Sequence, residues 1–466
     1  MPRQQPLGAA TRWAAVTPPR CRLPNVSCFH GYAFAAGCEE AFAVDTNAVT
    51  FGPGVLRECG PTLAALGCHR VALFTDARVG ALAHVAVARA SLAAAGLDAV
   101  VFDEVHIEPT DRSMAVAAAF AREGRFDGYL SVGGGSVIDT CKAAALYATW
   151  PADFFDYVNA PIGQGRAVPG PLPPHVACPT TAGTGSECTG IAIFDAVELG
   201  AKTGIASRRL RPAHALVDPT CTETLPSSVV AAAGFDVLCH AVESYTARPF
   251  SARSRPTSPT ARPMSQGRNP WSDIGSLQAL ELCGRFLARA VADAHDVEAR
   301  HALAWAATLA GIAFGNAGVH LPHAMSYAVA GLAHDLGPGR EYHCLGYPDD
   351  EAFVPHGLSV IVNAPSVFRA LASSAPARHL EAARAVGADT RDAIDADAGA
   401  ILADKLITMM QMTHAPNGLA GVGYRADDVA RLTRGAFAQK RLVDNAPRVI
   451  DEASLAKLFT DALRYW

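Results

Sequence analysis

One stretch of the chain decides its fold: Ser131-Val132-Gly133-Gly134-Gly135-Ser136-Val137-Ile138-Asp139-Thr140-Cys141-Lys142. A β-rich run leads into it, and helix-forming residues follow. The glycines let the backbone approach an anion closely, and the N–H groups of Gly135 and Ser136 would point at a phosphate from the positive end of a helix. The run is neither a Walker loop nor the GxGxxG fingerprint. By itself it is equally typical of a tight strand-to-helix turn.

A second polar loop follows the next predicted strand: Pro179-Thr180-Thr181-Ala182-Gly183-Thr184-Gly185-Ser186-Glu187. It offers the hydroxyls of Thr180, Thr181, Thr184 and Ser186, although a solvated turn with capping hydroxyls has the same composition. Two such loops at the carboxyl ends of strands predict a dinucleotide cleft. Asp76 ends an earlier strand, where a carboxylate binds ribose hydroxyls and favours NAD over NADP.

The wider pattern predicts two domains. Short β-rich runs at 71–75, 99–102, 128–132, 176–178 and 215–217 alternate with helical stretches such as 81–95 and 113–123. That alternation predicts an α/β domain over residues 41–219, with a parallel sheet wrapped by helices. Long helical patterns dominate residues 220–466 and predict an all-helical domain. Irregular inserts at 247–270 and 336–355 interrupt it.

Composition narrows the class of protein. The chain has 466 residues, enough for roughly two to four domains, and 50% of them are hydrophobic. A net charge of −5 lacks the positive field that nucleic-acid binding needs, so we expect no such partner. The 12 cysteines are scattered without a CxxC pair, which indicates a reducing, intracellular compartment.

Two segments could be taken for targeting or membrane signals. Residues 1–40 form an N-terminal extension, and its first 38 residues carry four arginines and no acidic residue, as in a mitochondrial transit peptide. Their prolines oppose an amphipathic helix, so an unstructured extension is the alternative. The uncharged stretch from residue 302 to 321 and beyond is long enough to span a membrane. Its polar residues favour a buried helix instead, and we expect no membrane partner.

The second half carries metal-ligand signals. Asp236 and His240 are four residues apart, so both project from one face of a helix. They could share a divalent ion or simply form a hydrogen bond within the helix. His320, His323 and His356 follow within 37 positions. One Asp and three His would suit Fe(II) or Zn(II), and ligand type does not choose between them.

At these residues the sequence resembles the iron-containing alcohol dehydrogenase family. The likeness rests on residues 133–136 with Asp139 and Lys142, the loop from Pro179 to Glu187, and then Asp236, His240, His323 and His356. It spans residue 41 to the C-terminus. The resemblance implies an N-terminal Rossmann-like NAD-binding domain and a C-terminal helical metal-binding domain. It also implies a metal site formed by the last four residues, with Fe(II) preferred and Zn(II) as the alternative.

Within the family, the likeness is greatest to members that pass hydride from a hydroxyacid to an oxoacid. It rests on residues 262–274, 315–327 and 139–143. The resemblance implies oxidation of 4-hydroxybutyrate to succinate semialdehyde and reduction of 2-oxoglutarate to 2-hydroxyglutarate, with NAD retained between the two steps. It assigns Gly133, Gly134, Gly135, Ser136, Asp139 and the hydroxyls of the second loop to the cofactor, and places Lys202 near the cofactor ribose.

One position departs from the family pattern. Many alcohol-oxidising relatives have a second histidine four residues after the metal ligand, and here that position is Tyr327. We therefore expect His320 or Tyr327 to handle the proton. Both expected substrates are carboxylates, so the pocket should present an arginine. Arg262 and Arg208 are the candidates, and a solvated loop arginine is the alternative for each.

Other functions remain possible at this stage. The chain could be an ordinary NAD-dependent alcohol dehydrogenase that acts on another small alcohol or hydroxyacid and exchanges its cofactor at each turnover. A relative acting on phosphorylated polyols or making a carbocycle would need a more basic pocket. A cofactor-binding scaffold or filament subunit would not need four metal ligands. We expect a homo-oligomer, in the mitochondrial matrix of a eukaryote or the cytoplasm of a bacterium.

Overall fold

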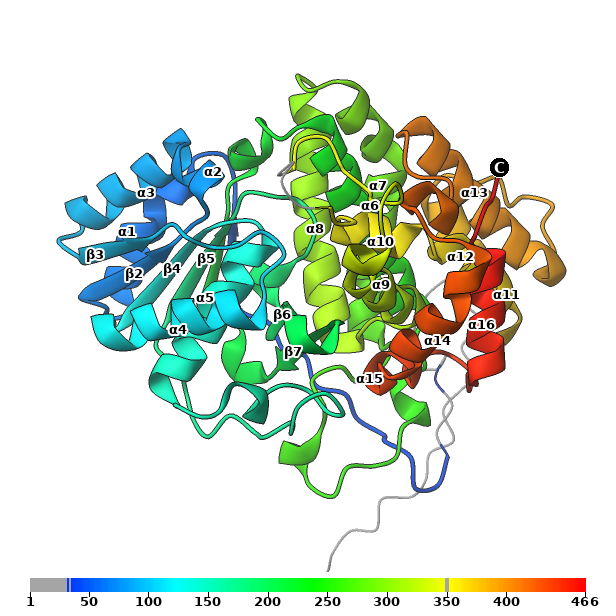
Figure 1. Ribbon diagram of the computed structural model, residues 1–466, viewed down its shortest axis with the longest axis horizontal. Helices are drawn as coiled ribbons and strands as arrows, with labels where there is room; N and C mark the ends of the chain where they lie inside the picture. Colours follow the sequence, from blue (N-terminus) through cyan, green and yellow to red (C-terminus); the bar gives the residue numbers. More distant parts are fainter. Residues whose placement is uncertain (1–31, 33–34, 348–351) are drawn as a thin grey trace, which may run out of the picture.

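A computed structural model describes Tyr32, residues 35–347 and residues 352–466. The half that contains the labels β2 to β5 in Figure 1 is a parallel sheet with helices on both faces, in the strand order β1-β8-β5-β4-β2-β3. The strands are β1 (Ala48–Phe51), β2 (Arg70–Phe74), β3 (Asp98–Phe102), β4 (Gly128–Gly133), β5 (His175–Pro179) and β8 (His214–Val217). The predicted α/β class and the five predicted strands of this sheet are confirmed.

Alternating side chains divide this sheet between two cores. Val71 and Leu73 pack on one face against α1 (Cys59–Ala65) and α3 (Ala83–Ala94). Ala72 and Phe74 pack on the other face against α4 (Asp111–Gly124) and α5 (Gly135–Thr149). The short helix α2 (Ala77–Gly80) follows β2. Because both faces are covered, the strands are hydrophobic throughout rather than alternating, as in other buried parallel sheets.

An antiparallel hairpin of β6 (Ile191–Ala196) and β7 (Ala201–Ala206) leaves this sheet and packs toward the helical half. Neither this hairpin nor β1 was predicted from the sequence. The turn at 197–200 also places Lys202 opposite Asp195 in the hairpin register.

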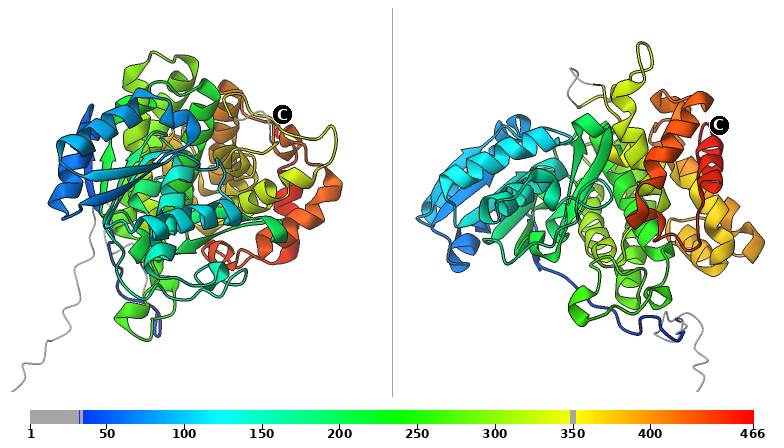
Figure 2. Two further views of the ribbon diagram at one scale, coloured as in Figure 1. Left: turned by 60° about the vertical axis from the view of Figure 1, so that its left-hand side comes forward. Right: turned by 60° about the horizontal axis from the view of Figure 1, so that its bottom comes forward.

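The second half is helical and has one large core. Figure 2 shows this half from two further sides. They are α6 (Ser227–Thr246), α7 (Pro270–Ala292), α8 (Val297–Ala317), α9 (Leu321–Gly331), α10 (His356–Ile361), α11 (Ala364–Leu371), α12 (Pro376–Ala385), α13 (Ala398–Met412), α14 (Val429–Phe437), α15 (Lys440–Val443) and α16 (Glu452–Asp461). The last strand ends at Val217 and α6 begins at Ser227, so the expected domain boundary at 219/220 stays a prediction that falls between them.

The uncharged stretch forms two helices instead of one. It ends α8 and begins α9, and the chain bends by 103° between them. Within the described ranges no single helix is long and apolar enough to cross a membrane. Only α8 and α9 taken together would be, by length and composition alone. Ala306 and Ala310 of α8 are fully buried, as the prediction of a buried helix requires.

Tyr32 and Glu39, at the beginning of the described chain, contact the insert at 247–270 and the start of α7. Tyr32 is buried, its hydroxyl donates to Asp273 Oδ2 at 2.9 Å, and its ring packs against Phe250. Glu39 accepts a hydrogen bond from Arg262 Nε at 3.0 Å. The blue segment that follows runs along the underside of the molecule to the sheet (Figures 1 and 2). Most of the predicted targeting signal at residues 1–38 lies outside the described residues, in 1–31 and 33–34.

Candidate active site

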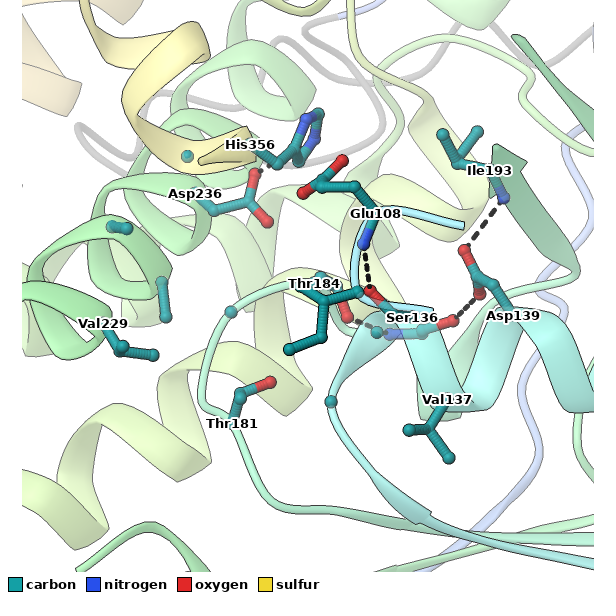
Figure 3. Close-up of a pocket in the computed structure, with 18 of the residues that line it drawn as sticks. Glu108, Ser136, Val137, Asp139, Thr181, Thr184, Ile193, Val229, Asp236 and His356 are labelled. Carbon is teal, nitrogen blue, oxygen red and sulfur yellow. Dashed lines mark hydrogen bonds and ion pairs between the residues drawn. The ribbon is translucent and has the colours of Figure 1, made fainter. Parts of the chain in front are cut away.

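The glycine-rich turn carries the chain from β4 directly into α5, with Gly134 as the residue that precedes the helix. A Cβ on Gly135 would lie 2.6 Å from Thr184 Cγ2, so only glycine allows the second polar loop to approach this closely. Ser136 Oγ accepts a hydrogen bond from the Glu108 N–H at 3.2 Å (Figure 3). Gly134, Gly135 and Ser136 line a cleft, whereas Gly133 lies in the strand behind it.

The second polar loop lines the same cleft. Thr180, Thr181, Thr184 and Ser186 all contribute to its wall, and the Thr180 N–H donates to Gly133 O at 3.0 Å. The structure therefore brings together the two loops that the sequence placed 40 to 50 residues apart. Their glycines and hydroxyls converge at the carboxyl edge of the parallel strands, which is where nucleotides bind in open α/β sheets.

Asp139 lines the cleft, but much of its carboxylate is used within the protein. Oδ2 accepts from the Ile193 N–H at 2.9 Å, and Oδ1 contacts Lys142 Nζ at 3.1 Å and Ser186 Oγ (Figure 3). Burial lowers the pKa of Lys142 more than Asp139 raises it. This buried pair fixes α5 against the hairpin and the second loop, so Asp139 shapes the cofactor cleft through its neighbours as well as lining it.

Asp76 follows β2 and lines the cleft, at the end of the strand where the sequence predicted it. Its Oδ1 accepts from the N–H groups of Arg78 and Val79 at 2.9 and 3.0 Å, so it caps α2. Asp76 and Arg78 both line the cleft. Arg78 Nη1 also donates to Gly346 O at 2.9 Å, which connects the sheet to the loop that follows α9 in the helical half.

Four predicted metal ligands meet across three helices. The Nε2 atoms of His240 on α6 and His323 on α9 lie 3.5 Å from Asp236 Oδ1, and that of His356 on α10 lies 3.6 Å from it. Figure 3 shows Asp236 and His356 facing each other. Ligand atoms of Asp236, His240 and His323 all lie within 4.8 Å of one another, and all three residues are buried. The alternative of a simple Asp236–His240 hydrogen bond does not describe this cluster.

A close helix contact brings His356 to the cluster. A Cβ on Gly357 would lie 1.9 Å from Ala232 O, so glycine is required where α10 crosses α6. Burial lowers the pKa of His240 to about 3 and lowers that of His356, against the opposing effect of Asp236. Neutral imidazoles are the form that binds metal ions.

The cluster fits a divalent cation. Asp236 Oδ1 and His323 Nε2 are buried, and neither has a hydrogen-bond partner among the described residues. Buried polar atoms without partners are rare and costly, and two such atoms of metal-ligand type facing one point are satisfied by an ion between them. A carboxylate and imidazoles together suit first-row divalent metals.

Glu243, on the turn of α6 after His240, supports the cluster from behind. It is fully buried, and its Oε1 lies 2.6 Å from His323 Nδ1. Its Oε2 accepts from the His320 N–H at 2.7 Å. Burial raises the pKa of Glu243, but His323 outweighs it, so the pKa is lowered overall. A carboxylate behind a histidine ligand fixes the tautomer and orientation of the ring. No local sequence pattern singles out Glu243, although it lies one helical turn from His240.

Metal cluster and polar loops line one continuous cavity of about 460 Å³. Lys202 lies in its wall and is ion-paired with Glu108 at 2.6 Å and Asp195 at 3.1 Å. Glu108 is a further cleft residue that the sequence analysis missed. It has a left-handed backbone with φ 54°, and its carboxylate lies beside His356 in Figure 3. Left-handed non-glycine residues are costly and cluster at functional sites.

Of the two residues expected to handle the proton, only one reaches the cleft. Tyr327 lines it, one helical turn after His323. His320 does not: it precedes α9, and its Nε2 lies 3.1 Å from Thr246 Oγ1, away from the cavity. Burial lowers its pKa to about 4. The expectation for His320 is wrong because its ring points into the helical core.

The two arginines expected to hold substrate carboxylate also lie elsewhere. Arg262 pairs with Glu39, while Arg208 pairs with Asp45 and donates to Arg262 O at 2.8 Å. Neither lines the cleft. Both guanidinium groups instead fasten the N-terminal segment to the molecule, which corrects the sequence-based expectation. Arg441 of α15, which the sequence analysis did not consider, lines the cleft beside Tyr327.

Comparison with known families agrees with this geometry. Residues 46–219 match the family described as iron-containing alcohol dehydrogenase, and residues 263–337 and 342–463 match the C-terminal part of the Fe-containing alcohol dehydrogenase family. The chain belongs to the iron-containing alcohol dehydrogenase family, as its motifs predicted.

Curated relatives narrow the likeness further. The chain is 46% identical over 452 residues to "Hydroxyacid-oxoacid transhydrogenase, mitochondrial" of Xenopus laevis, and 45% identical over 455 residues to the protein of that name from Homo sapiens. Each match covers 96% of both chains. Among solved structures, 1,3-propanediol oxidoreductase is similar with a TM-score of 0.78 and 28% identity, and an alcohol dehydrogenase from Oenococcus oeni with 0.77 and 27%. Each covers 91% of this chain and 100% of its own, which confirms the expected fold.

Proposed function

We propose that this protein is a hydroxyacid–oxoacid transhydrogenase that oxidises 4-hydroxybutyrate to succinate semialdehyde and uses the same hydride to reduce 2-oxoglutarate to 2-hydroxyglutarate. The observation that carries the proposal is the single cleft, in which the polar loops and the Asp-His cluster face one cavity. The curated relatives, similar over 96% of the chain, support the reaction type. Atoms balance, because the two hydrogens lost by the hydroxyacid are gained by the oxoacid.

Asp236, His240, His323 and His356 would hold the divalent ion, and we propose Fe(II), as in the name of the family, with Zn(II) as the alternative. Gly134, Gly135, Ser136 and the hydroxyls of the second loop would bind NAD, with Asp76 at the ribose end. When these groups are bound, the chemistry supplied is polarisation of the reacting oxygen by the ion and hydride transfer by the nicotinamide.

The chain's own residues orient the reaction and exclude water. Burial raises the pKa of Tyr327, so its phenol keeps its proton at neutral pH and can donate a hydrogen bond to the reacting oxygen. Lys202 is held by two carboxylates and fixes Glu108 at the rim of the metal cluster.

A Tyr327→Phe variant should lower turnover and change the pH profile of turnover. Unchanged turnover and profile would remove Tyr327 from the mechanism.

Retention of NAD between the two half-reactions distinguishes a transhydrogenase from a dehydrogenase. The Arg78–Gly346 hydrogen bond supports retention, because it joins the sheet to the helical half at the wall of the cleft. Ser228 Oγ holds the same loop through Leu345 O. The alternative is an NAD-dependent alcohol dehydrogenase of the same family that releases NADH after each turnover.

One experiment separates these functions. Purified, metal-replete protein is mixed with 4-hydroxybutyrate and 2-oxoglutarate without added nicotinamide, and both products are assayed. Equal amounts of succinate semialdehyde and 2-hydroxyglutarate are expected. If neither forms until free NAD is added and NADH then accumulates, the protein is the alternative dehydrogenase. An Asp236→Ala variant should be inactive in both assays, and elemental analysis of the wild type identifies the metal.

The relatives' names also bear on where the protein acts. Those from Xenopus laevis and Homo sapiens are named as mitochondrial, so we propose a mitochondrial matrix location. Sub-organelle fractionation with a matrix marker tests it. We also propose a homo-oligomer, for which light scattering of the purified protein gives the mass directly.

A further inference from the structure

The substrate end of the cleft contains an arginine that the mechanism above does not use. Arg441 is half-buried in α15 and lines the cavity together with Tyr327, Ser265, Gly318 and Val319. Its guanidinium has no hydrogen bond or ion pair with any described residue. It is close enough to Tyr327 to oppose the rise that burial causes in the pKa of that phenol.

The other cations in the cleft wall are already engaged. Within the described residues the wall contains three lysine and arginine side chains, Arg78, Lys202 and Arg441. Lys202 is held between Glu108 and Asp195, and Arg78 donates to Gly346 O. Arg78 lies beside Asp76 at the ribose end of the cleft, so Arg441 is the cation near Tyr327 whose charge and donors are available to a ligand.

The backbone around Arg441 is firmly held. Leu442 and Val443 are buried, and Gln439 Nε2 donates to Lys202 O at 3.2 Å. Asn445 Nδ2 donates to Ala317 O at 3.2 Å and Val319 O at 3.0 Å, at the junction of α8 and α9. Binding groups carried on fixed backbone lose little entropy when the ligand arrives.

A second polar group in this end of the cleft lacks a partner. Ser265 Oγ is buried and has no hydrogen bond to any part of the described chain. A Cβ on Gly318 would lie 2.9 Å from Ser265 Cβ and 2.9 Å from Asn445 Nδ2, so Ser265 sits beside the segment that carries Arg441. A buried hydroxyl without a partner is expected to bind a ligand or water.

These groups lie at a suitable place relative to the metal cluster. His323 and Tyr327 are four residues apart on α9 and therefore share one face of the helix. Tyr327 and Arg441 line the same cavity as His323, and the positive charge of Arg441 is close enough to oppose the rise that burial causes in the pKa of Tyr327. The metal ligand, the phenol and the guanidinium therefore share one cavity wall.

The two proposed substrates share one feature that such an arrangement recognises. In 4-hydroxybutyrate the carbon that bears the hydroxyl is three bonds from the carboxylate carbon. In 2-oxoglutarate the keto carbon is also three bonds from the distal carboxylate carbon. A single fixed cation can therefore hold both substrates with the reacting carbon in the same place.

We infer that Arg441, assisted by the Ser265 hydroxyl, forms the subsite that binds the distal carboxylate of both the hydroxyacid and the oxoacid. The inference rests on the proposed function for the identity of these acids. An arginine fork binds a carboxylate through two parallel hydrogen bonds. The subsite makes this cleft selective for acids over neutral alcohols of the same length.

The test compares 4-hydroxybutyrate with 1,4-butanediol, in which a hydroxymethyl group replaces the carboxylate. Reduction of the NAD on NAD-loaded protein is followed in single turnovers for each, in wild type and in Arg441→Gln, and its second-order rate constant gives kcat/KM for the half-reaction. Loss of a charge-assisted pair should lower kcat/KM for 4-hydroxybutyrate about 10- to 100-fold and leave that for the diol within about twofold. Arg441→Lys should restore part of the difference. Arg448→Gln, an exposed neighbour, is the matched control and should behave like wild type.

Binding of glutarate, an unreactive five-carbon diacid, gives a readout independent of turnover. Calorimetry on NAD-loaded protein should show binding to wild type and Arg448→Gln, and about 10- to 100-fold weaker binding to Arg441→Gln. Equal glutarate affinity in wild type and Arg441→Gln, or an unchanged acid-to-diol ratio, overturns the inference. Failure of the wild type to exchange hydride without added NAD overturns the proposed function alone, because both comparisons of Arg441 still apply.

Discussion

Glu243 has no exposed surface, and its carboxylate is used by the two histidines at the start of α9. A Glu243→Gln variant keeps the shape but loses the charge that orients His323. We expect metal affinity to fall about 10- to 100-fold, as for other groups behind a metal ligand. Competition with a chromogenic chelator measures the affinity, and circular dichroism checks that the helices are retained. Glu298→Gln, at an exposed ion pair, is the control. Equal affinity in the three proteins would show that Glu243 serves packing only.

At the scale of single residues, the sequence predicted what depends on local spacing. Asp236 and His240 share a helix face, and the resemblance selected His323 and His356 from the three histidines that follow them. The arginines were assigned wrongly, because spacing does not show that Arg262 and Arg208 face Glu39 and Asp45, which are more than 160 residues away. Arg441 has no local pattern that marks it. Only the fold brings α15 to the cleft.

Among the elements, the crossing of α10 over α6 depends on Gly357. In a Gly357→Ala variant the new methyl group would meet Ala232 O at 1.9 Å, so α10 must move away from α6 and carry His356 from Asp236. We expect weaker metal binding and a free energy of unfolding lower by about 1–3 kcal/mol. Chemical denaturation and metal titration measure the two effects. Gly387→Ala is the control. Gly387 lies in a left-handed surface turn, so this variant measures the cost of replacing a glycine with positive φ where the new methyl group meets no backbone. Metal affinity as in wild type would mean that α10 accommodates the methyl group.

The start of β2 depends on Asp127, whose carboxylate accepts from the N–H groups of His69 and Arg70 at 2.9 and 2.8 Å. Burial raises the pKa of Asp127, but these donors outweigh it and lower the pKa. A lowered pKa stabilises the fold above the unfolded value near 4, and this contribution disappears as pH falls through the folded value. Asp127→Asn should therefore reduce the free energy of unfolding by about 0.5–1 kcal/mol at pH 7, since the group is half-exposed. The difference from wild type should shrink below about pH 4.

Urea titrations at several pH values measure this difference. The exposed Asp103, which has no partner in the described part of the chain, provides the control Asp103→Asn. A difference that stays constant down to pH 3 would show that the Asp127 charge has no part in holding β2.

The sequence predicted the elements that repeat a strong pattern. Four of the five strands that it located, β2, β4, β5 and β8, lie inside the parallel sheet, where hydrophobic runs are continuous, and the fifth, β3, forms an edge. It missed β1, a partly buried edge strand of four residues whose partner β8 lies more than 160 residues away. It also missed the β6–β7 hairpin, whose two strands pair with each other over residues 191–206 and of which only β6 alternates in burial.

For the molecule as a whole, the metal cluster ties together three helices of the large core. Removal of the ion should leave the helices in place but lower the melting temperature, because a bound ligand stabilises the folded state. At a metal concentration of about 100 times its Kd this amounts to about 2.7 kcal/mol. Calorimetry with and without a chelator measures the shift, and re-addition of metal should reverse it. An unchanged melting temperature after verified metal loss would mean that the cluster does not bind the ion in the folded protein.

Tyr32 has a consequence for maturation. Its ring packs between Phe250 and the Arg268 guanidinium, and its hydroxyl donates to Asp273, so these contacts fasten the described start of the chain to the helical half. A processing peptidase that cuts before Tyr32 keeps these contacts, whereas one that cuts after Tyr32 removes them. The new amino terminus of the mature polypeptide, read by mass spectrometry of protein from its native source, should therefore lie at or before this tyrosine.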